Sequence, residues 1–236
     1  AICREHHIWM HVDGAYGASV LLCRQYRHLL DGIGLADSLS WDAHKWLFQT
    51  YGCGMVLVNN KADMVQTFHA HPEYLKDLDT DEEYLNPWNL GIELTRPARG
   101  LKLWLTLQVM GSDAVSDAIA HGFRMAEYAQ EELLKNPDIE ILSPARLSTL
   151  NFRYNPPGLT ESQKDDLNLK ISQEIIASGY AGVFTTELNS HKVLRICAIH
   201  PGTTQSDIRH IIRRLNDCYY RHLSRLGIGT AGQFAS

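Results

Sequence analysis

The sequence predicts an α/β fold, and three observations support this. Short apolar runs typical of buried strands alternate with longer segments whose apolar residues recur at helical spacing. Three of the strand-like runs lie close together in the first part of the chain, as the strands of one buried sheet would. Hydrophobic residues make up 44% of the 236 residues, enough for one large core or two modest ones.

The first part of the chain is expected to contain a sheet and several helices. Strands are predicted at 8–12, 35–41 and 53–58, and helices at 62–68, 98–110 and 112–135. A short helical segment is expected to end near residue 30. Gly111 separates the last two helices, and the acidic segment 69–89 has no periodicity. A loop of that length inside a compact domain is usually functional or disordered.

A domain boundary is predicted near residue 137, which gives domains 1–137 and 138–236. In the second domain, Thr-Glu-Ser-Gln at 160–163 is a capping box that opens a helix. Asn-Ser at 189–190 predicts a hairpin turn. The other elements expected there are strands at 139–142, 148–154, 183–188 and 192–199, and a helix from about residue 204.

Charge and cysteine content argue against several classes of protein. Lysine and arginine number 22 against 27 acids, which gives no nucleic-acid or membrane-surface footprint. No apolar run approaches the roughly 20 residues that cross a bilayer, and no signal-peptide pattern is present. The five cysteines form no Cys-x-x-Cys pair, so we expect a reducing, cytoplasmic location. The histidines lack partners at metal-ligand spacing, so no metal is expected.

Two stretches together suggest a site for an aldehyde cofactor. Lys45 lies in an apolar run, where lysines are rare and where desolvation favours the amine nucleophile that forms a Schiff base. Asp13 ends an apolar run and precedes Gly14 and Ala15, which are small enough for a flat ring to lie against them. Pyridoxal phosphate needs such a lysine, and a carboxylate that keeps its pyridine nitrogen protonated.

Each of these two residues also has an ordinary structural explanation. The stem of a lysine often lies along an apolar surface with its ammonium group in water, and this alternative would be favoured for Lys45 alone. An aspartate before a glycine often only forms a turn, as Asp13 could. The two stretches together are a more specific signal than either, and this combination favours the cofactor site.

Five stretches occur in an order typical of one enzyme family. They are His-Val-Asp-Gly-Ala-Tyr at 11–16, Tyr-Arg-His-Leu-Leu-Asp-Gly at 26–32, Ala-Asp-Ser-Leu-Ser-Trp-Asp-Ala-His-Lys-Trp-Leu at 36–47, Leu-Thr-Arg-Pro-Ala-Arg-Gly-Leu-Lys-Leu-Trp at 94–104 and Val-Leu-Arg-Ile-Cys at 193–197. In these motifs the chain resembles the C-terminal half of the group II pyridoxal-phosphate-dependent amino acid decarboxylases, of the aromatic-L-amino-acid decarboxylase type.

The resemblance implies a fold and partners. It implies fold type I of the pyridoxal-phosphate enzymes, with the end of a large, mostly parallel-sheet domain followed by a small C-terminal α/β domain. The segment at about 69–89 would be a mobile loop over the active site. The chain is then expected to need the N-terminal half of the same enzyme, as a separate or cleaved chain. The joined unit would form a homodimer.

The resemblance also assigns roles to individual residues. Lys45 would be the Schiff-base lysine and Asp13 the partner of the pyridine nitrogen. Ala15 would be the small residue against the ring face. His44 would contact the phosphate or shape the approach of the lysine, although a merely structural histidine is an equal alternative. Tyr51 would lie near the substrate pocket of the neighbouring subunit, or else in the core.

Three further residues near these motifs need separate interpretation. Asp42 stands where the aromatic enzymes are expected to have asparagine, and an acid there would repel a phosphate dianion. A phosphate contact at this position is therefore in doubt. Arg96 and Arg99 could bind a substrate carboxylate, but a decarboxylase benefits from an apolar environment for the leaving carboxylate. We therefore favour structural ion pairs for both.

The activity implied is decarboxylation of an L-amino acid, with aromatic ones favoured, to the amine and carbon dioxide. Some relatives instead form an aldehyde, and a non-catalytic regulatory chain is a further alternative. The family's proton-donating tyrosine aligns at about Pro87, where the nearest aromatic residues are Tyr84 and Trp88. Because indole is only an N–H donor, Tyr84 is the expected proton donor.

Overall fold

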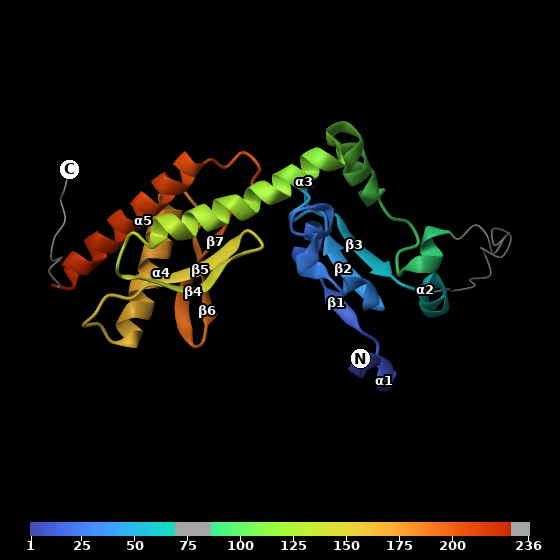
Figure 1. Ribbon diagram of the computed structural model, residues 1–236, viewed down its shortest axis with the longest axis horizontal. Coiled ribbons are helices and arrows are strands. Elements are labelled where there is room, and N and C mark those ends of the chain that lie inside the picture. The colour runs from blue at the N-terminus through green and yellow to red at the C-terminus, as the bar shows by residue number, and fades with distance from the viewer. Residues whose placement is uncertain (69–85, 228–236) are drawn as a thin grey trace. The chain divides into compact units, whose positions relative to one another are not determined.

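The structure is a computed structural model that describes residues 1–68 and 86–227 (Figure 1). The chain divides into two compact units, which are described separately. Unit 1 comprises Ala1–Ser116 and unit 2 comprises Asp117–Ser236. No helix in the described part of the chain is long and apolar enough to cross a membrane.

The long helix α3 (Arg99–Leu133) contains residues of both units. Gly111 interrupts it with φ 80° and ψ 158°, a conformation that residues with a side chain rarely adopt. This break confirms the two helices predicted on either side of Gly111. Met125 and Leu133, after the break, lie in the core of unit 2. For this reason the units divide inside α3, whereas the sequence places the boundary near residue 137, after the helix.

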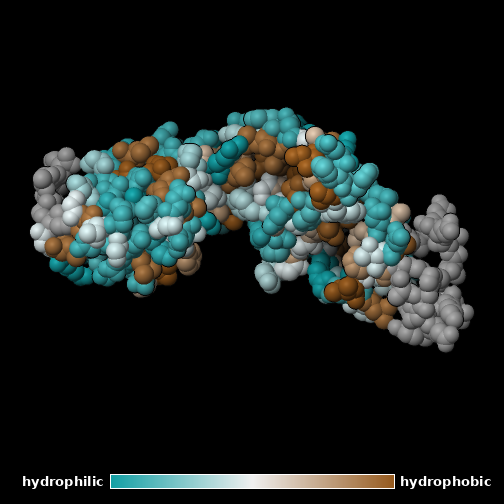
Figure 2. All heavy atoms as spheres, turned by 90° about the horizontal axis from the view of Figure 1, so that it is seen from below, coloured by the Kyte–Doolittle hydropathy of each residue, from teal (hydrophilic) through white to brown (hydrophobic). Residues whose placement is uncertain are grey.

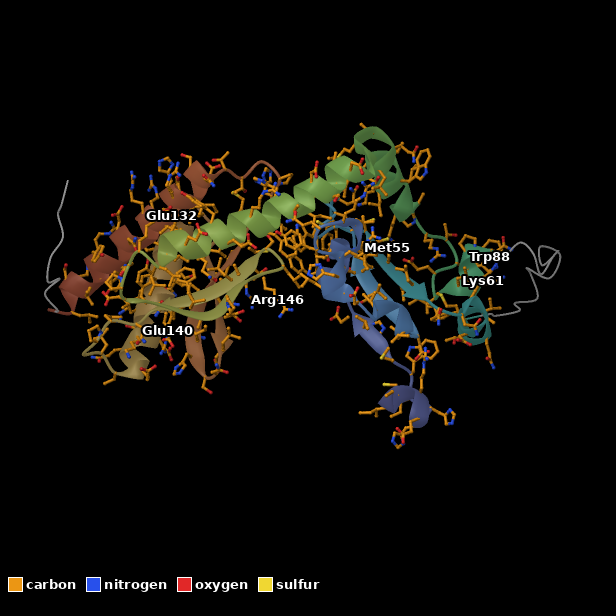
Figure 3. The ribbon with its side chains drawn as sticks, in the orientation of Figure 1. Met55, Lys61, Trp88, Glu132, Glu140 and Arg146 are labelled. Atoms are coloured by element: carbon orange, nitrogen blue, oxygen red, sulfur yellow. The ribbon has the colours of Figure 1, made fainter. Side chains whose placement is uncertain are left out.

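Unit 1 contains a three-stranded sheet in the order β1-β2-β3. β1 (His11–Asp13) pairs in parallel with β2 (Ser38–Asp42), and β2 pairs antiparallel with β3 (Gly54–Val58). Figure 3 labels Met55, which lies opposite Trp41 in this second pairing. The three strands overlap the three predicted segments, so the prediction of a sheet here is confirmed.

The strands of unit 1 are less buried than the sequence predicts. Val56 and Leu57 on β3 are 54% and 45% exposed, and Ile8 and Trp9 before β1 are 54% and 52% exposed. The predicted burial of the strand at 8–12 is therefore wrong for this structure, because the described residues leave about half of these side chains exposed. Hydrophobic residues accordingly reach the molecular surface (Figure 2).

Short helices complete the described part of unit 1. Helix α2 confirms the predicted helix at 62–68, and its neighbour η5 packs against it. Figure 3 labels Lys61 on α2 and Trp88 on η5. Residues 69–85 of the predicted loop lie outside the described residues. The bounds are α1 (Ile2–Glu5), η1 (Gly17–Leu22), η2 (Arg27–Leu30), η3 (Ile33–Leu35), α2 (Lys61–Phe68) and η5 (Pro87–Leu90).

Unit 2 contains an antiparallel sheet in the order β4-β5-β7-β6. The predicted hairpin is confirmed, because Asn189 and Ser190 both have positive φ, at 52° and 62°. The capping box of Thr160 with Gln163 is also confirmed. The bounds are β4 (Ile139–Arg146), β5 (Thr149–Tyr154), α4 (Glu161–Ala177), β6 (Phe184–Leu188), β7 (His191–Cys197) and α5 (Gln205–Arg225).

The core of unit 2 lies between this sheet and three helices. Alternate residues of a strand point to the same face of its sheet. On β5 these are Leu150, Phe152 and Tyr154, and all three are fully buried. They pack in one cluster with apolar residues of α4, α5 and the second part of α3. Leu167 and Ile171, on the predicted apolar face of α4, are both in this cluster. Unit 2 thus has a core of its own.

Candidate active site

The predicted lysine and aspartate follow two neighbouring strands of unit 1. Asp13 is the last residue of β1 and is paired in register with Ser40 of β2. β2 ends at Asp42, and Lys45 follows it at the start of the next loop. Because β1 and β2 are parallel, the two carboxyl ends meet at the same edge of the sheet, the usual place for ligand sites in α/β sheets.

The carboxylate of Asp13 is exposed and held by two hydrogen bonds. The backbone N–H of Ala15 and the hydroxyl of Ser40 both donate to Asp13 Oδ1, at 3.1 Å each. These two hydrogen bonds lower the pKa of Asp13 below its ordinary value of 3.8, the backbone bond having the larger effect. Asp13 is therefore an anion at neutral pH, and its Oδ2 can accept a further hydrogen bond.

The small residues after Asp13 serve the packing of the chain. A Cβ atom on Gly14 would lie 2.6 Å from Leu39 Cδ1 and 2.9 Å from Ala18 Cβ. Glycine is therefore required at this position because β2 and η1 pack against it. The sequence analysis gave a different reason, namely that a small residue leaves space for the ring of the cofactor. The carbonyl of Ala15 accepts a hydrogen bond from the N–H of Asp42 at 2.9 Å, which ties the loop after β1 to the end of β2.

Lys45 lies at the surface next to a carboxylate. Its side chain is 43% exposed, and its Nζ lies 2.9 Å from Asp42 Oδ2. The apolar neighbours Trp46 and Leu47 point into the core, at 0% and 2% exposure. The predicted desolvation of Lys45 is therefore wrong for this structure. Asp42, expected to be unfavourable beside a phosphate, is instead the counter-ion of Lys45.

His44 links Asp42 to the loop that leads to β3. The backbone N–H of Cys53 donates to His44 Nδ1 at 3.2 Å, so the proton of the neutral ring is assigned to Nε2. Nε2 lies 3.8 Å from Asp42 Oδ2. The imidazole also meets the ring of Tyr51 edge-on, with 5.1 Å between the centroids. His44 therefore contacts both the lysine's counter-ion and an exposed aromatic ring.

Tyr51 stands on the loop between β2 and β3 and is 91% exposed. The chain around it turns sharply, because Phe48 and Gly52 both have positive φ, at 60° and 79°. The alternative that Tyr51 belongs to the core is therefore wrong. An aromatic ring held at the surface beside His44 can contact a ligand or a partner chain.

The two arginines make structural hydrogen bonds. Arg99 forms a two-bond ion pair with Glu93, at 2.7 and 3.0 Å, which confirms the structural ion pair expected for it. Arg96 Nη2 donates to the carbonyl of Pro87 at 2.7 Å. Tyr84 lies outside the described residues.

Ser40 is a site residue that the sequence analysis missed. Its hydroxyl holds Asp13 Oδ1, as described above. The signal that would have found it is the alternation of Ser38 and Ser40 in β2, which places both serine side chains on one face of the strand. Parallel pairing with β1 then puts Ser40 opposite Asp13.

These residues fit a pyridoxal phosphate site. An exposed, ionised carboxylate can pair with a protonated pyridine nitrogen, and the exposed amine of Lys45 can form a covalent bond with the aldehyde. His44, beside Lys45, offers an N–H donor for a phosphate oxygen. No three histidine, cysteine or acidic side chains among the described residues cluster in a way that could hold a metal ion.

Residues 1–155 match the pyridoxal-dependent decarboxylase conserved domain. The chain belongs to this family. It is 40% identical, over 91% of its length, to an aromatic-L-amino-acid decarboxylase of Bacillus atrophaeus, and 32% identical, over 91%, to a phenylacetaldehyde synthase of a Rosa hybrid cultivar. The matches cover 45% and 43% of those relatives, so the chain spans less than half of their length.

A solved structure extends this agreement to the fold. The crystal structure of Catharanthus roseus tryptophan decarboxylase in complex with L-tryptophan superposes with a TM-score of 0.81 at 28% identity, covering 93% of this chain and 46% of that one. The match confirms the predicted α/β fold of the type I class. The family is pyridoxal-dependent, which confirms the cofactor predicted from Lys45 and Asp13.

Proposed function

We propose that the intact protein containing this chain decarboxylates an L-amino acid to the amine and carbon dioxide. The observation that carries the proposal is the pairing of parallel strands that brings the ionised Asp13 and the amine of Lys45 to one sheet edge. An aromatic amino acid is the favoured substrate class. This choice is supported by the curated relative from Bacillus atrophaeus and by the exposed ring of Tyr51 near the site.

Each residue of the site has a role in this proposal. The amine of Lys45 anchors the cofactor covalently, and Asp13 holds a proton at the pyridine nitrogen. Ala15 lies against the ring face, and His44 donates to the phosphate. When bound, pyridoxal phosphate supplies an electron sink for the charge left on the substrate carbon after carbon dioxide departs. Tyr51 contributes to the substrate pocket of the neighbouring subunit.

The partners and location belong to the same proposal. The exposed apolar side chains around β1 and β3 fit a surface that the N-terminal half of the enzyme covers, whether that half is a separate or a cleaved chain. The joined unit would form a homodimer in the cytoplasm. The match to the curated relative from Bacillus atrophaeus covers 45% of that protein, which is consistent with a need for a second half.

Aldehyde formation is the second candidate function. It is favoured by the 32% identity to a phenylacetaldehyde synthase. If Tyr84 returns a proton to the substrate carbon, Tyr84→Phe should lower amine formation by about 10²-fold or more, the usual scale for a general acid, and raise the aldehyde yield. Aldehyde as the main product of the unaltered enzyme would favour this candidate instead.

The experiment that tests the proposal is a panel of L-amino acids assayed for carbon dioxide, amine and aldehyde. We expect release of carbon dioxide and amine in equal amounts from at least one aromatic substrate, together with the visible absorbance of bound cofactor. Bound cofactor with no release from any amino acid would contradict the proposal. Absence of bound cofactor would favour the non-catalytic regulatory chain.

A further inference from the structure

Lys102 of α3 makes an unusual set of hydrogen bonds to the loop after Lys45. Its Nζ donates to the carbonyl of Thr50 at 2.7 Å, to the hydroxyl of Thr50 at 3.1 Å and to the carbonyl of Tyr51 at 2.9 Å. An ammonium group has three donors, so these bonds use all of them. The full hydrogen-bonding capacity of Lys102 is directed at two adjacent residues.

Two other residues of α3 hold the same loop. Cys53 Sγ donates to the carbonyl of Arg99 at 3.2 Å, and Gln49 Nε2 donates to the hydroxyl of Thr106 at 3.1 Å. Positions 99, 102 and 106 are three, four and seven residues apart, so they share one face of the helix. This face of α3 therefore fastens the loop at 49–53 from one end to the other, with Lys102 at its centre.

The fastened loop carries the contacts that orient His44. Tyr51 meets the imidazole edge-on, and the backbone N–H of Cys53 donates to His44 Nδ1. Phe48 and Gly52 have positive φ, so the loop has a specific backbone shape for the helix to maintain. A shift of the carbonyls of residues 50 and 51 would move the Tyr51 ring and the donor on Cys53 together.

We propose that Lys102 is a positioning residue, which fixes Tyr51 for the substrate pocket of the neighbouring subunit and, through the loop at 49–53, fixes the ring of His44 beside Lys45. This role deepens the proposed function and rests on it. The convergence of three bonds on one atom requires the compact ammonium of lysine, since the planar guanidinium of arginine spreads its donors over a fork. Lys102 would therefore act through geometry as well as charge.

The test compares Lys102→Met and Lys102→Arg in the intact enzyme, with Lys135→Met as a matched control. Lys135 pairs with Glu132 in unit 2 and has no role in the proposed site, so its loss should leave the kinetics unchanged. We expect both Lys102 variants to raise KM for the amino acid about tenfold and to weaken cofactor binding through His44, with kcat at saturating cofactor changed less than about twofold, because Lys45 and Asp13 are untouched.

A double-mutant cycle with Tyr51→Ala separates positioning from general stability. If Lys102 acts through Tyr51, Lys102→Met should add little to the KM of Tyr51→Ala, so the two effects are not additive. Fully additive effects would overturn the proposal, as would a wild-type KM in Lys102→Met. A wild-type KM in Lys102→Arg alone would overturn the claim about geometry, because charge would then be sufficient.

Hydrogen exchange gives a result that does not depend on activity. The amides of Gln49 and Cys53 are bonded to Ala43 and His44, and Lys102→Met should increase exchange in the peptide containing them about tenfold or more. Unchanged exchange there would overturn the positioning role. If the unaltered enzyme decarboxylates no amino acid, the proposed function fails, whereas the exchange experiment still decides whether Lys102 fixes the loop.

Discussion

The two units differ in how their strands are covered. In unit 2, Leu150, Phe152 and Tyr154 of β5 are completely buried between the sheet and its helices. In unit 1, Val56 and Leu57 of β3 are about half exposed, and the strands carry the proposed site at their edge. Within the described residues, the strands of unit 2 are covered by helices of the same unit, whereas the strands that carry the proposed site in unit 1 are only partly covered.

The largest effect is expected from Lys45→Ala in unit 1. It removes the covalent anchor of the cofactor, so turnover should be abolished, while the melting temperature of unit 2 stays unchanged. Carbon dioxide release and calorimetry check the two halves of this prediction. Lys61→Ala, in α2 of the same unit, is the control and should retain activity. Measurable turnover near the wild-type rate in Lys45→Ala would refute the assignment.

Asp13→Asn should reduce turnover by about 10²-fold or more, because an amide cannot hold a proton at the pyridine nitrogen. Some cofactor should remain bound through Lys45. In the unaltered enzyme the lowered pKa keeps Asp13 ionised, so its contribution is lost only as the pH falls below its ordinary value of 3.8. A pH–rate profile tests this point. The prediction would be contradicted if the unaltered enzyme lost activity on acidification well above pH 3.8 and Asp13→Asn abolished that loss.

A pair of truncations tests the difference in stability. Phe152→Ala, fully buried in unit 2, should destabilise the fold by about 3–5 kcal/mol, the usual cost of this truncation in a core. Leu57→Ala, at 45% exposure, should cost well under half of that, with both variants compared in the isolated chain at a dilution that prevents its aggregation. Urea unfolding measures both. If the two truncations lowered the free energy of unfolding by equal amounts, the proposed difference between the units would be wrong.

The same comparison predicts that the isolated chain exposes apolar surface. Residues 1–236 without a second half should bind a hydrophobic dye and aggregate, because the apolar side chains around β1 and β3 are exposed. A fragment of residues 117–236, which contains the complete cluster of unit 2, should remain monomeric and melt cooperatively. A monomeric, cooperatively melting isolated chain with bound cofactor would contradict the need for a partner.

The smallest effect concerns the exposed carboxylate of Glu161 in unit 2. Bonds from Lys164 and Arg153 lower the pKa of Glu161 from 4.5 to about 2. Arg153 also donates to Glu140, which Figure 3 labels. Since the pKa is depressed in the folded state, this contribution to stability is present above pH 4.5 and is lost as the pH falls toward about 2. In Glu161→Gln the urea unfolding midpoint should fall less between pH 4.5 and about 2 than in the unaltered chain. The same fall in both proteins would contradict the prediction.

Much of the secondary structure could be predicted because local signals agree with the fold. The capping box at Thr160, the turn at Asn189 and the break at Gly111 each depend on a few neighbouring residues, and all three occur as predicted. The burial of strands 8–12 could not be predicted, since it depends on what packs against them. Alternation alone does not say whether a covering layer is within the same chain.

The sequence suggests the residues of the candidate site, but it does not predict what surrounds them. The order of motifs placed Asp13 and Lys45, whereas the exposure of Lys45 depends on how Trp46 and Leu47 pack. The bonds from Ser40 to Asp13 and from Lys102 to the loop at 49–53 join residues distant in the sequence. Such contacts become visible only when strand pairing and helix placement are known.

The most direct test of the central claim is reduction of the cofactor-loaded intact enzyme with borohydride, followed by digestion and mass spectrometry. If Lys45 is the covalent anchor, the pyridoxyl mass should be found on the peptide that contains Lys45, and Lys45→Ala should remove it. A pyridoxyl group attached mainly to another lysine, such as Lys102, would contradict the account. So would bound cofactor that borohydride does not attach to the chain.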